Sequence, residues 1–231
     1  MTKLNISAER ARLAMTCMAK NDIRYYLNGI LVEPRAEGGA FIAGTNGHHL
    51  IVVIDESGVC DEPTILRIGN DLMRRCAKPG LHTKNIQRLQ LDEFRGKPAL
   101  LLTDPVTGEL PDYVQFDPIV HRKFPEWRNV VPDLRTLKRG HASAFNTDLL
   151  HAVTSVLKSN RYGIHAIPYQ QPSDNPGTDA KPIVFHLVGH EYACLLLMPL
   201  RDMQKESIDG LVARWPAAAK KAPAAKEGVP A

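Results

Sequence analysis

The sequence predicts an α+β protein built from repeated β-α-β-β-β units, with the helices on one face of antiparallel sheets. Two observations support this prediction. A helix-like segment followed by three β-rich segments occurs three times along the chain. Turn signals such as Gly38-Gly39 and Asn46-Gly47 separate β-rich segments. The order of elements therefore repeats, although the residues themselves recur at no fixed period.

The first unit is expected to begin with a short strand over residues 3–6. Ser7 is placed to cap a helix from Ala8 to Ala19, whose apolar side chains follow helical spacing. The strands expected after this helix cover residues 24–33, 40–44 and 49–54. Tyr25 and Tyr26 fall on the first of these strands, so their side chains are expected to point to opposite faces.

The second and third units repeat this order. Asn70 is expected to cap the second helix, which Pro79-Gly80 ends, and Asn146 or Thr147 caps the third. The expected strands of the second unit are residues 64–68, 87–91, 98–103 and 113–116. Those of the third unit are residues 142–145, 163–169, 183–188 and 192–198, and a further helical turn or two is expected within residues 208–215.

Composition restricts the class of protein. The chain has 231 residues, 44% of them hydrophobic, which is enough for a sizeable core. Its net charge of +4 permits a polyanionic partner without requiring one. No uncharged apolar run approaches the roughly 20 residues that span a bilayer, so a cytoplasmic protein is expected. The four isolated cysteines are expected to be buried free thiols.

Motifs for catalysis are absent from the sequence. No phosphate-binding G-x-x-x-x-G-K-[ST] loop, G-x-S-x-G elbow or D-x-D metal pair occurs. The pair His48-His49 invites a metal interpretation, but neighbours on a strand diverge and no third ligand is close in sequence. A structural or cleft-wall role is the favoured interpretation of these histidines. We therefore expect no enzyme activity, no cofactor and no metal site.

Four short stretches resemble one known family. They are DIRYYLNGILVE (22–33), AGTNGHHLIVV (43–53), FPEWRNVVP (124–132) and ACLLLMPLR (193–201). In this order they are similar to segments of the bacterial sliding clamp, the β subunit of DNA polymerase III, from its middle domain and a shortened last domain. The resemblance implies the DNA-clamp type of repeated unit.

The resemblance also implies a domain organisation. Residues 1–121 would form a complete clamp-like domain of two units, and 122–140 a connector. Residues 141–201 would form a shortened clamp-like domain of one unit. Residues 202–231, which are low in complexity, are expected to be a largely disordered tail. Because these units pair to bury their faces, the third unit points to a partner chain or a shortened domain.

In that family, a hydrophobic cleft between the middle and last domains receives short peptides of polymerases and repair proteins. The resemblance therefore implies a sliding-clamp-like DNA replication and processivity factor that tethers partner proteins to DNA. The residues that it places on the cleft walls come from all three units. They are Leu27, Thr45, Gly47, His48, His49, Leu50, Pro125, Asn129, Val130, Leu196 and Met198.

Two positions depart from the family pattern. His49 and Asn129 stand where clamps usually have arginine. Both changes remove a fixed positive donor from the cleft rim, so acidic or strongly polar peptide positions should be recognised less well. The peptides chosen by this chain are therefore expected to differ from those of a host clamp.

The same resemblance suggests DNA contacts, because clamps touch DNA at the start of the tyrosine strand and along the helices that line their hole. The residues carried over are Arg24, Tyr25, Tyr26, Arg10, Arg12, Lys20, Arg74, Arg75 and Lys78. Two interpretations stay open for each group. The tyrosines either contact DNA or are structural, and the basic side chains either face DNA or form solvated helix faces.

The expected partners follow from these two sites. They are double-stranded DNA, bound without sequence preference, and DNA polymerase or other clamp-binding proteins, bound through short peptides. A homo-oligomeric ring would need three or four copies of the chain, depending on whether the connector hides a degenerate fourth unit. The alternative is a non-ring adaptor or decoy that binds clamp-interacting peptides without encircling DNA. A membrane partner is not expected.

Overall fold

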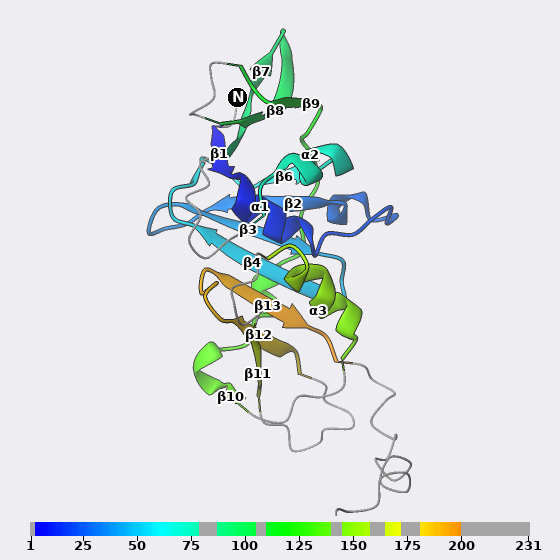
Figure 1. Ribbon diagram of the computed structural model, residues 1–231, viewed down its shortest axis with the longest axis vertical. Coiled ribbons are helices and arrows are strands. Elements are labelled where there is room, and N and C mark those ends of the chain that lie inside the picture. Colours follow the sequence, from blue (N-terminus) through cyan, green and yellow to red (C-terminus); the bar gives the residue numbers. More distant parts are fainter. Residues whose placement is uncertain are drawn as a thin grey trace, which may run out of the picture.

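The computed structural model describes residues 3–78, 87–104, 110–139, 145–157, 165–171 and 181–199. The described elements form an elongated molecule in which two sheets follow one another along the long axis (Figure 1). No helix in these ranges is long and apolar enough to cross a membrane. The expected strand over 142–145 lies mostly outside the described residues, as do residues 202–231 with the turn expected in 208–215.

The first unit begins as expected. The Ser7 side chain accepts a hydrogen bond from the Arg10 N–H and so caps the first helix, which ends at Met15 rather than at Ala19. A 3-10 turn, η1 (Tyr25–Leu27), precedes the first strand of the following hairpin. The other elements of this unit are β1 (Leu4–Ser7), α1 (Ala8–Met15), β2 (Gly29–Pro34), β3 (Ala40–Thr45), β4 (His49–Asp55) and β5 (Val59–Cys60).

The second unit follows the expected order, and the third follows it from its helix onward. Asn146 caps the third helix by accepting from the Asp148 N–H, whereas Gly69 rather than Asn70 is the N-cap of the second. The second unit has β6 (Thr64–Arg67), α2 (Asn70–Arg75), β7 (Arg88–Phe94), β8 (Lys97–Thr103) and β9 (Tyr113–Phe116). The remainder has η2 (Trp127–Asn129), η3 (Leu134–Thr136), β10 (Lys138–Arg139), α3 (Thr147–Thr154), β11 (Ala166–Gln170), β12 (Ile183–Leu187) and β13 (Ala193–Leu197).

The first and second units exchange their first strands. One sheet has the order β5-β1-β7-β8-β9, so the first strand of the chain pairs with strands of the second unit. Leu4 of β1 faces Leu91 of β7 in this antiparallel pair. In return, β6 pairs with β2, and Leu31 faces Ile65. The exchange interlocks the two units, so neither sheet is complete without both.

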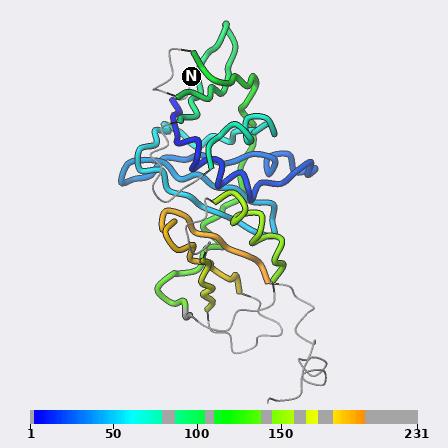
Figure 2. Tube along the Cα trace, in the orientation of Figure 1, coloured from blue at the N-terminus to red at the C-terminus, as the bar shows by residue number. Residues whose placement is uncertain are grey.

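The second sheet joins the third unit to the first. Its order is β10-β11-β12-β13-β4-β3-β2-β6, and the contact between units is the antiparallel pair of β13 and β4. Leu195 faces Ile51 in this pair, and Leu196 faces Leu50. The trace of Figure 2 shows these two strands, far apart in sequence, crossing the molecule together. The end of this pair becomes one wall of the site described below.

Alternating residues of the eight-stranded sheet serve two different cores. Ile51 and Val53 of β4 lie in the core under α1 and α3, which cover the same face of the sheet (Figure 1). Leu50 and Val52 point to the opposite face and pack with Phe124 and Trp127 of the connector. The helices therefore lie on one face, as the sequence predicts, while the connector covers part of the other.

Candidate peptide-binding cavity

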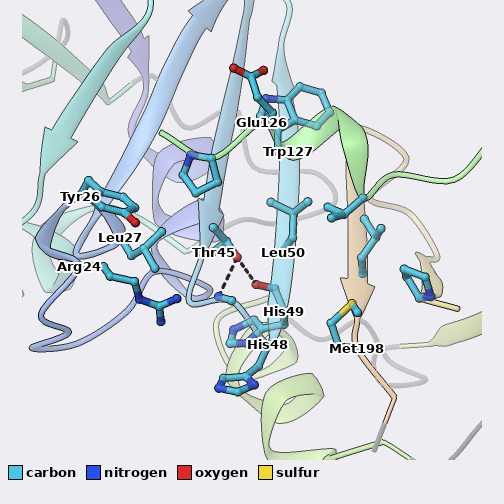
Figure 3. A pocket seen from close by; sticks show the side chains of 15 residues that line it. Arg24, Tyr26, Leu27, Thr45, His48, His49, Leu50, Glu126, Trp127 and Met198 are labelled. Carbon is cyan, nitrogen blue, oxygen red and sulfur yellow. Dashed lines mark hydrogen bonds between the residues drawn. The ribbon is translucent and has the colours of Figure 1, made fainter. Parts of the chain in front are cut away.

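A cavity of about 290 Å³ lies where the connector meets the ends of β4 and β13 (Figure 3). Five stretches of the chain wall it: residues 24–27 around η1, residues 45–50 at the turn between β3 and β4, residues 125–130 of the connector, Pro182, and the end of β13 with Met198. The residues that line it are Arg24, Tyr26, Leu27, Thr45, Gly47, His48, His49, Leu50, Pro125, Glu126, Trp127, Val130, Pro182, Leu196 and Met198.

The η1 wall is held by a local carboxylate. Asp22 accepts hydrogen bonds from the Arg24 backbone N–H (2.8 Å) and from the Arg24 guanidinium Nη2 (2.7 Å). These bonds lower the pKa of Asp22 to about 2. The Leu27 N–H donates to the Arg24 carbonyl at 2.8 Å, which closes the 3-10 turn and directs Leu27 into the buried side. Arg24 and Leu27 thus reach the cavity from one short turn.

The turn between β3 and β4 is fixed by its own side chains. The Thr45 hydroxyl donates to the His49 carbonyl at 2.7 Å and accepts from the Gly47 N–H at 3.1 Å (Figure 3). The Asn46 side chain accepts from the N–H groups of His48 and His49. Gly47 has a φ of +89°, a conformation that favours glycine. The cavity edge is therefore preorganised without a ligand.

The two histidines of this turn diverge. His48 is exposed, whereas His49 is buried and burial lowers its pKa from 6.5. A hydrogen bond with the Thr16 backbone acts on this pKa in the opposite direction, but less strongly than burial. A buried neutral imidazole at this position cannot replace the fixed positive charge of an arginine. Histidine in place of the arginine of the family pattern therefore leaves this position without a fixed positive charge.

The connector wall is anchored by aromatic and charged contacts. Trp127 packs edge to face on Phe41 of β3, with ring centroids 5.6 Å apart. The Arg128 guanidinium lies 4.2 Å from the centroid of the Trp127 ring and forms an ion pair of 2.5 Å with Glu33. Nearby, Lys123 pairs with Glu126 at 2.9 Å, which lowers the pKa of Glu126. These contacts hold the connector against the sheet.

The structure brings together all of the cleft residues predicted from the sequence except Asn129, which is exposed on η2 and is absent from the lining. Five lining residues were not assigned to the cleft: Arg24, Tyr26, Glu126, Trp127 and Pro182. Trp127 and Glu126 had a usable sequence signal, because they lie between the predicted wall residues Pro125 and Asn129. Pro182 lies outside the four stretches that resemble the clamp family, so no sequence signal indicated that it lines the cavity.

The prediction that Tyr25 and Tyr26 lie on a strand was wrong. Tyr25 and Tyr26 lie on the η1 turn and not on a strand, and their ring centroids are 6.4 Å apart in an edge arrangement. Tyr26 is half-buried and lines the cavity, while Tyr25 is exposed. The strand begins only at Gly29, because Arg24 and Asn28 close a turn on Asp22 first.

The basic residues predicted to face DNA differ in their contacts and in their exposure. Arg10 lies with its guanidinium carbon 3.0 Å from the centroid of the Tyr192 ring, and Arg12 donates to the carbonyls of Arg74 and Cys76. These two arginines are engaged within the chain, as are Arg24, which pairs with Asp22, and Arg75, whose guanidinium carbon lies 5.0 Å from the centroid of the Tyr113 ring. The exposed residues of the set are Lys20, Arg24, Arg74, Arg75 and Lys78.

Within the described ranges, no group of three or more His, Cys, Asp or Glu side chains could hold a metal ion. The four cysteines are free thiols, of which Cys17, Cys60 and Cys76 are buried and Cys194 is half-buried. Burial raises the pKa of the Cys60 and Cys194 thiols to about 11, which favours the unreactive protonated form. The cavity itself offers mainly apolar surface, with the charged side chains Arg24 and Glu126 at its edge.

Comparison with solved structures identifies the fold. A DNA polymerase sliding clamp from Pseudomonas aeruginosa, solved with a ligand, matches with a TM-score of 0.55 and 17% identity, over 86% of this chain and 66% of the clamp chain. The DNA polymerase III subunit beta from Borrelia burgdorferi, in complex with a natural product, matches with a TM-score of 0.53 and 12% identity, over 86% of this chain and 62% of that one.

These matches define the class: the chain has the α+β fold of a bacterial sliding clamp, the β subunit of DNA polymerase III. It spans slightly less than two thirds of the length of either matched chain. No protein-family model matches the sequence. No curated protein matches it either.

Proposed function

We propose that this chain is a sliding-clamp-like DNA processivity factor that tethers partner proteins through the cavity between η1, the β3–β4 turn and the connector. The observation that supports this proposal best is the cavity itself, because one apolar site draws its walls from segments far apart in the sequence. The role is binding, with no reaction assigned to the chain.

A short peptide is the ligand that suits this cavity. Leu27, Leu50 and Leu196 give a buried apolar floor, and Met198 at the open side is 38% exposed and adaptable in shape. Apolar anchor residues that enter a preformed pocket give a short peptide most of its affinity. A pocket fixed by the Thr45 hydrogen bonds also avoids part of the ordering cost on binding.

Charges at the cavity edge would orient the peptide. Arg24 and Glu126 lie on different walls, as Figure 3 shows, and each already has a partner in Asp22 or Lys123. The buried His49 adds no fixed charge. We therefore expect peptides with apolar anchors to bind better than strongly acidic ones.

DNA contact would come from exposed cations on and near the helices. Lys20, Arg74, Arg75 and Lys78 are exposed and suited to phosphate contacts without base recognition. A ring of several copies would place such contacts around the duplex and hold it without a fixed register. Double-stranded DNA, peptide-bearing replication proteins and further copies of the chain are the partners of this proposal.

The second candidate is a clamp-like adaptor that uses the cavity without encircling DNA. The engagement of Arg10 with Tyr192, and of Arg12 with two backbone carbonyls, favours it. These side chains have less freedom to follow a sliding duplex than unpartnered cations. The two candidates share the cavity and differ in oligomeric state and DNA binding.

The cavity is tested by binding a fluorescent peptide that carries the clamp-binding pattern of Gln followed by Leu and Phe. We expect a Kd in the micromolar range by fluorescence polarisation, and Met198→Ala should raise it about tenfold because the variant removes apolar surface that a bound peptide would cover. Leu134→Ala is the matched control, since Leu134 is an exposed apolar residue of the connector outside the cavity lining. It should leave the Kd unchanged.

Two results would contradict the cavity assignment. One is a wild-type chain that does not bind the peptide even at millimolar concentration. The other is an equal loss of affinity in Met198→Ala and Leu134→Ala, because a specific cavity contact would then not explain the effect.

A further inference from the structure

We propose that a segment of this chain itself, residues 208–215, folds back onto the apolar cavity and competes there with partner peptides. This inference rests on the proposed peptide-binding function and adds the regulation of that site. The segment has the sequence IDGLVARW and lies outside the described residues. It is the part of the tail in which the sequence predicts a helical turn or two.

The apolar side chains of this segment have the spacing of a helix with one apolar face. The four large ones recur at positions i, i+3, i+4 and i+7, and they are Ile208, Leu211, Val212 and Trp215. Ser207 before the segment suits a helix N-cap, and Pro216 after it suits a helix end. An isolated helix shorter than about 12 residues is marginal in water, so such a face needs an apolar surface on which to pack.

The chain leaves the last sheet at the edge of the cavity. The Met198 N–H donates to the His48 carbonyl at 3.0 Å, which fixes this end of the described chain beside the β3–β4 turn. Eight residues, 200–207, separate Pro199 from Ile208. They span at most about 30 Å when extended, and a flexible chain of this length has an end-to-end distance of about 16 Å. Residues 208–215 can therefore reach the cavity without rearrangement of the described fold.

The cavity offers the surface that this apolar face requires. Leu27, Leu50 and Leu196 form its buried floor. Two further lining residues, Val130 and Met198, are 46% and 38% exposed, so apolar surface continues from the floor to the open side. An amphipathic helix that binds in a hydrophobic groove uses anchors at i, i+3, i+4 and i+7.

The charge of the segment also suits the site. Asp209 and Arg214 give residues 208–215 one charge of each sign and no net charge. The cavity edge likewise carries one charge of each sign, on Arg24 and Glu126 (Figure 3). A neutral segment with four apolar side chains is the kind of ligand that the cavity favours over an acidic peptide.

Tethering makes even a weak contact effective. A short flexible linker gives its ligand an effective concentration on the order of 1 mM. If the separate segment binds with a Kd of roughly 0.1 mM, the tethered one occupies about nine tenths of the cavities, and a competing peptide binds about tenfold more weakly. The segment thus sets a threshold of affinity that a partner must exceed.

The test compares the full-length wild type with the full-length double variant Leu211→Ser, Trp215→Ser. The double variant removes two anchors one turn apart, so it should bind the fluorescent partner peptide with a Kd about tenfold lower than that of wild type. Val229→Ser is the matched control, since it changes an apolar residue of the same tail outside the segment and should leave the Kd unchanged. A misfolded variant would lose affinity and cannot imitate this gain.

A second arm supplies the segment as a separate peptide of residues 204–217. This peptide should displace the fluorescent partner peptide from the double variant at about 0.1 mM, whereas a scrambled peptide of the same composition should not. Failure of the 204–217 peptide to compete would overturn the inference.

Further outcomes separate the inference from the proposed function. Equal Kd values for the wild type and the double variant would overturn the inference and leave peptide binding by the cavity intact. A wild-type Kd that falls on dilution to that of the double variant would assign the segment to a second copy of the chain, which overturns occupation from within one chain.

The proposed function can also fail alone. If the partner peptide binds neither chain, while a fluorescent 204–217 peptide binds the double variant more tightly than the wild type, the segment stands as the ligand of the cavity. Absence of binding by both peptides would overturn the inference together with the proposed function.

Discussion

At the scale of single residues, His190 marks the junction between the first and third units. It is 2% exposed, and its Nδ1 lies 2.7 Å from the Tyr192 hydroxyl. Arg10 of α1 lies over the Tyr192 ring. Burial and the Arg10 charge lower the pKa of His190 from 6.5, while Glu191 acts weakly in the opposite direction. The junction is therefore built for an uncharged imidazole.

This geometry predicts a loss of stability in acid. The unfolded chain protonates His190 at its ordinary pKa, whereas the folded chain resists it, so stability falls as the pH drops below about 6.5. Urea unfolding between about pH 7 and pH 5 should show this fall, and His190→Gln should reduce it. His49, whose pKa is also lowered, should keep part of the dependence.

His151→Gln provides the control for the acid effect, because it removes an exposed histidine of α3. It should leave the pH dependence of the wild type intact. A pH profile that is the same in His190→Gln and in wild type would show that this junction does not supply the effect.

The sequence predicted which residues line the cavity better than it predicted the backbone conformation of the segments that carry them. The cavity residues Leu27, Leu50 and Met198 were found because short stretches resembled a known family. The tyrosine turn was misassigned, because apolar and aromatic composition suits a strand and the closing bonds to Asp22 are invisible in composition. Arg24 and Tyr26 were predicted from the family resemblance as DNA contacts, which stays a prediction, and the structure places both of them in the cavity lining.

At the scale of elements, the contact between α1 and β3 depends on Gly44. A Cβ built on Gly44 would lie 2.1 Å from the Ala14 carbonyl oxygen of α1. The absence of a side chain lets the helix approach the sheet closely enough to seal the main core. The strand pattern predicted the sheet here but not this close approach.

Gly44→Ala should therefore destabilise the protein by about 3 kcal/mol, because backbone atoms must move to admit the methyl group. Urea unfolding measures this loss. Gly38→Ala is the comparison: its φ is +90° but no other group lies within 4 Å of the added Cβ, so the cost is about 1 kcal/mol from the backbone alone. Equal losses in the two variants would contradict the packing account.

Several strands of four or more residues were predicted well, whereas the strands of two residues were not. β3, β4, β8 and β9 agree with their expected ranges to within a residue or so. β5 and β10 have two residues each and were missed, because so few positions carry no periodic signal. The ends of helices also shifted, as for α1 at Met15.

At the scale of the whole molecule, the repeat of units was readable but their assembly was not. The exchange of β1 and β6 between sheets depends on pairing across long sequence separations. The same holds for the pair of β13 and β4, which brings Leu196 beside Leu50 and completes the cavity. Local patterns cannot specify such pairings, whereas the resemblance of four stretches to one family indicated that residues of all three units meet at the cavity.

The central claim is that copies of this chain assemble as a clamp around DNA and use the cavity to hold partners. The most direct test is the mass of the protein in solution, measured by light scattering over a range of concentrations with and without duplex DNA. The account predicts a stable assembly of three or four chains. A mass that stays at one chain under all conditions would contradict the ring and leave the adaptor that binds peptides alone.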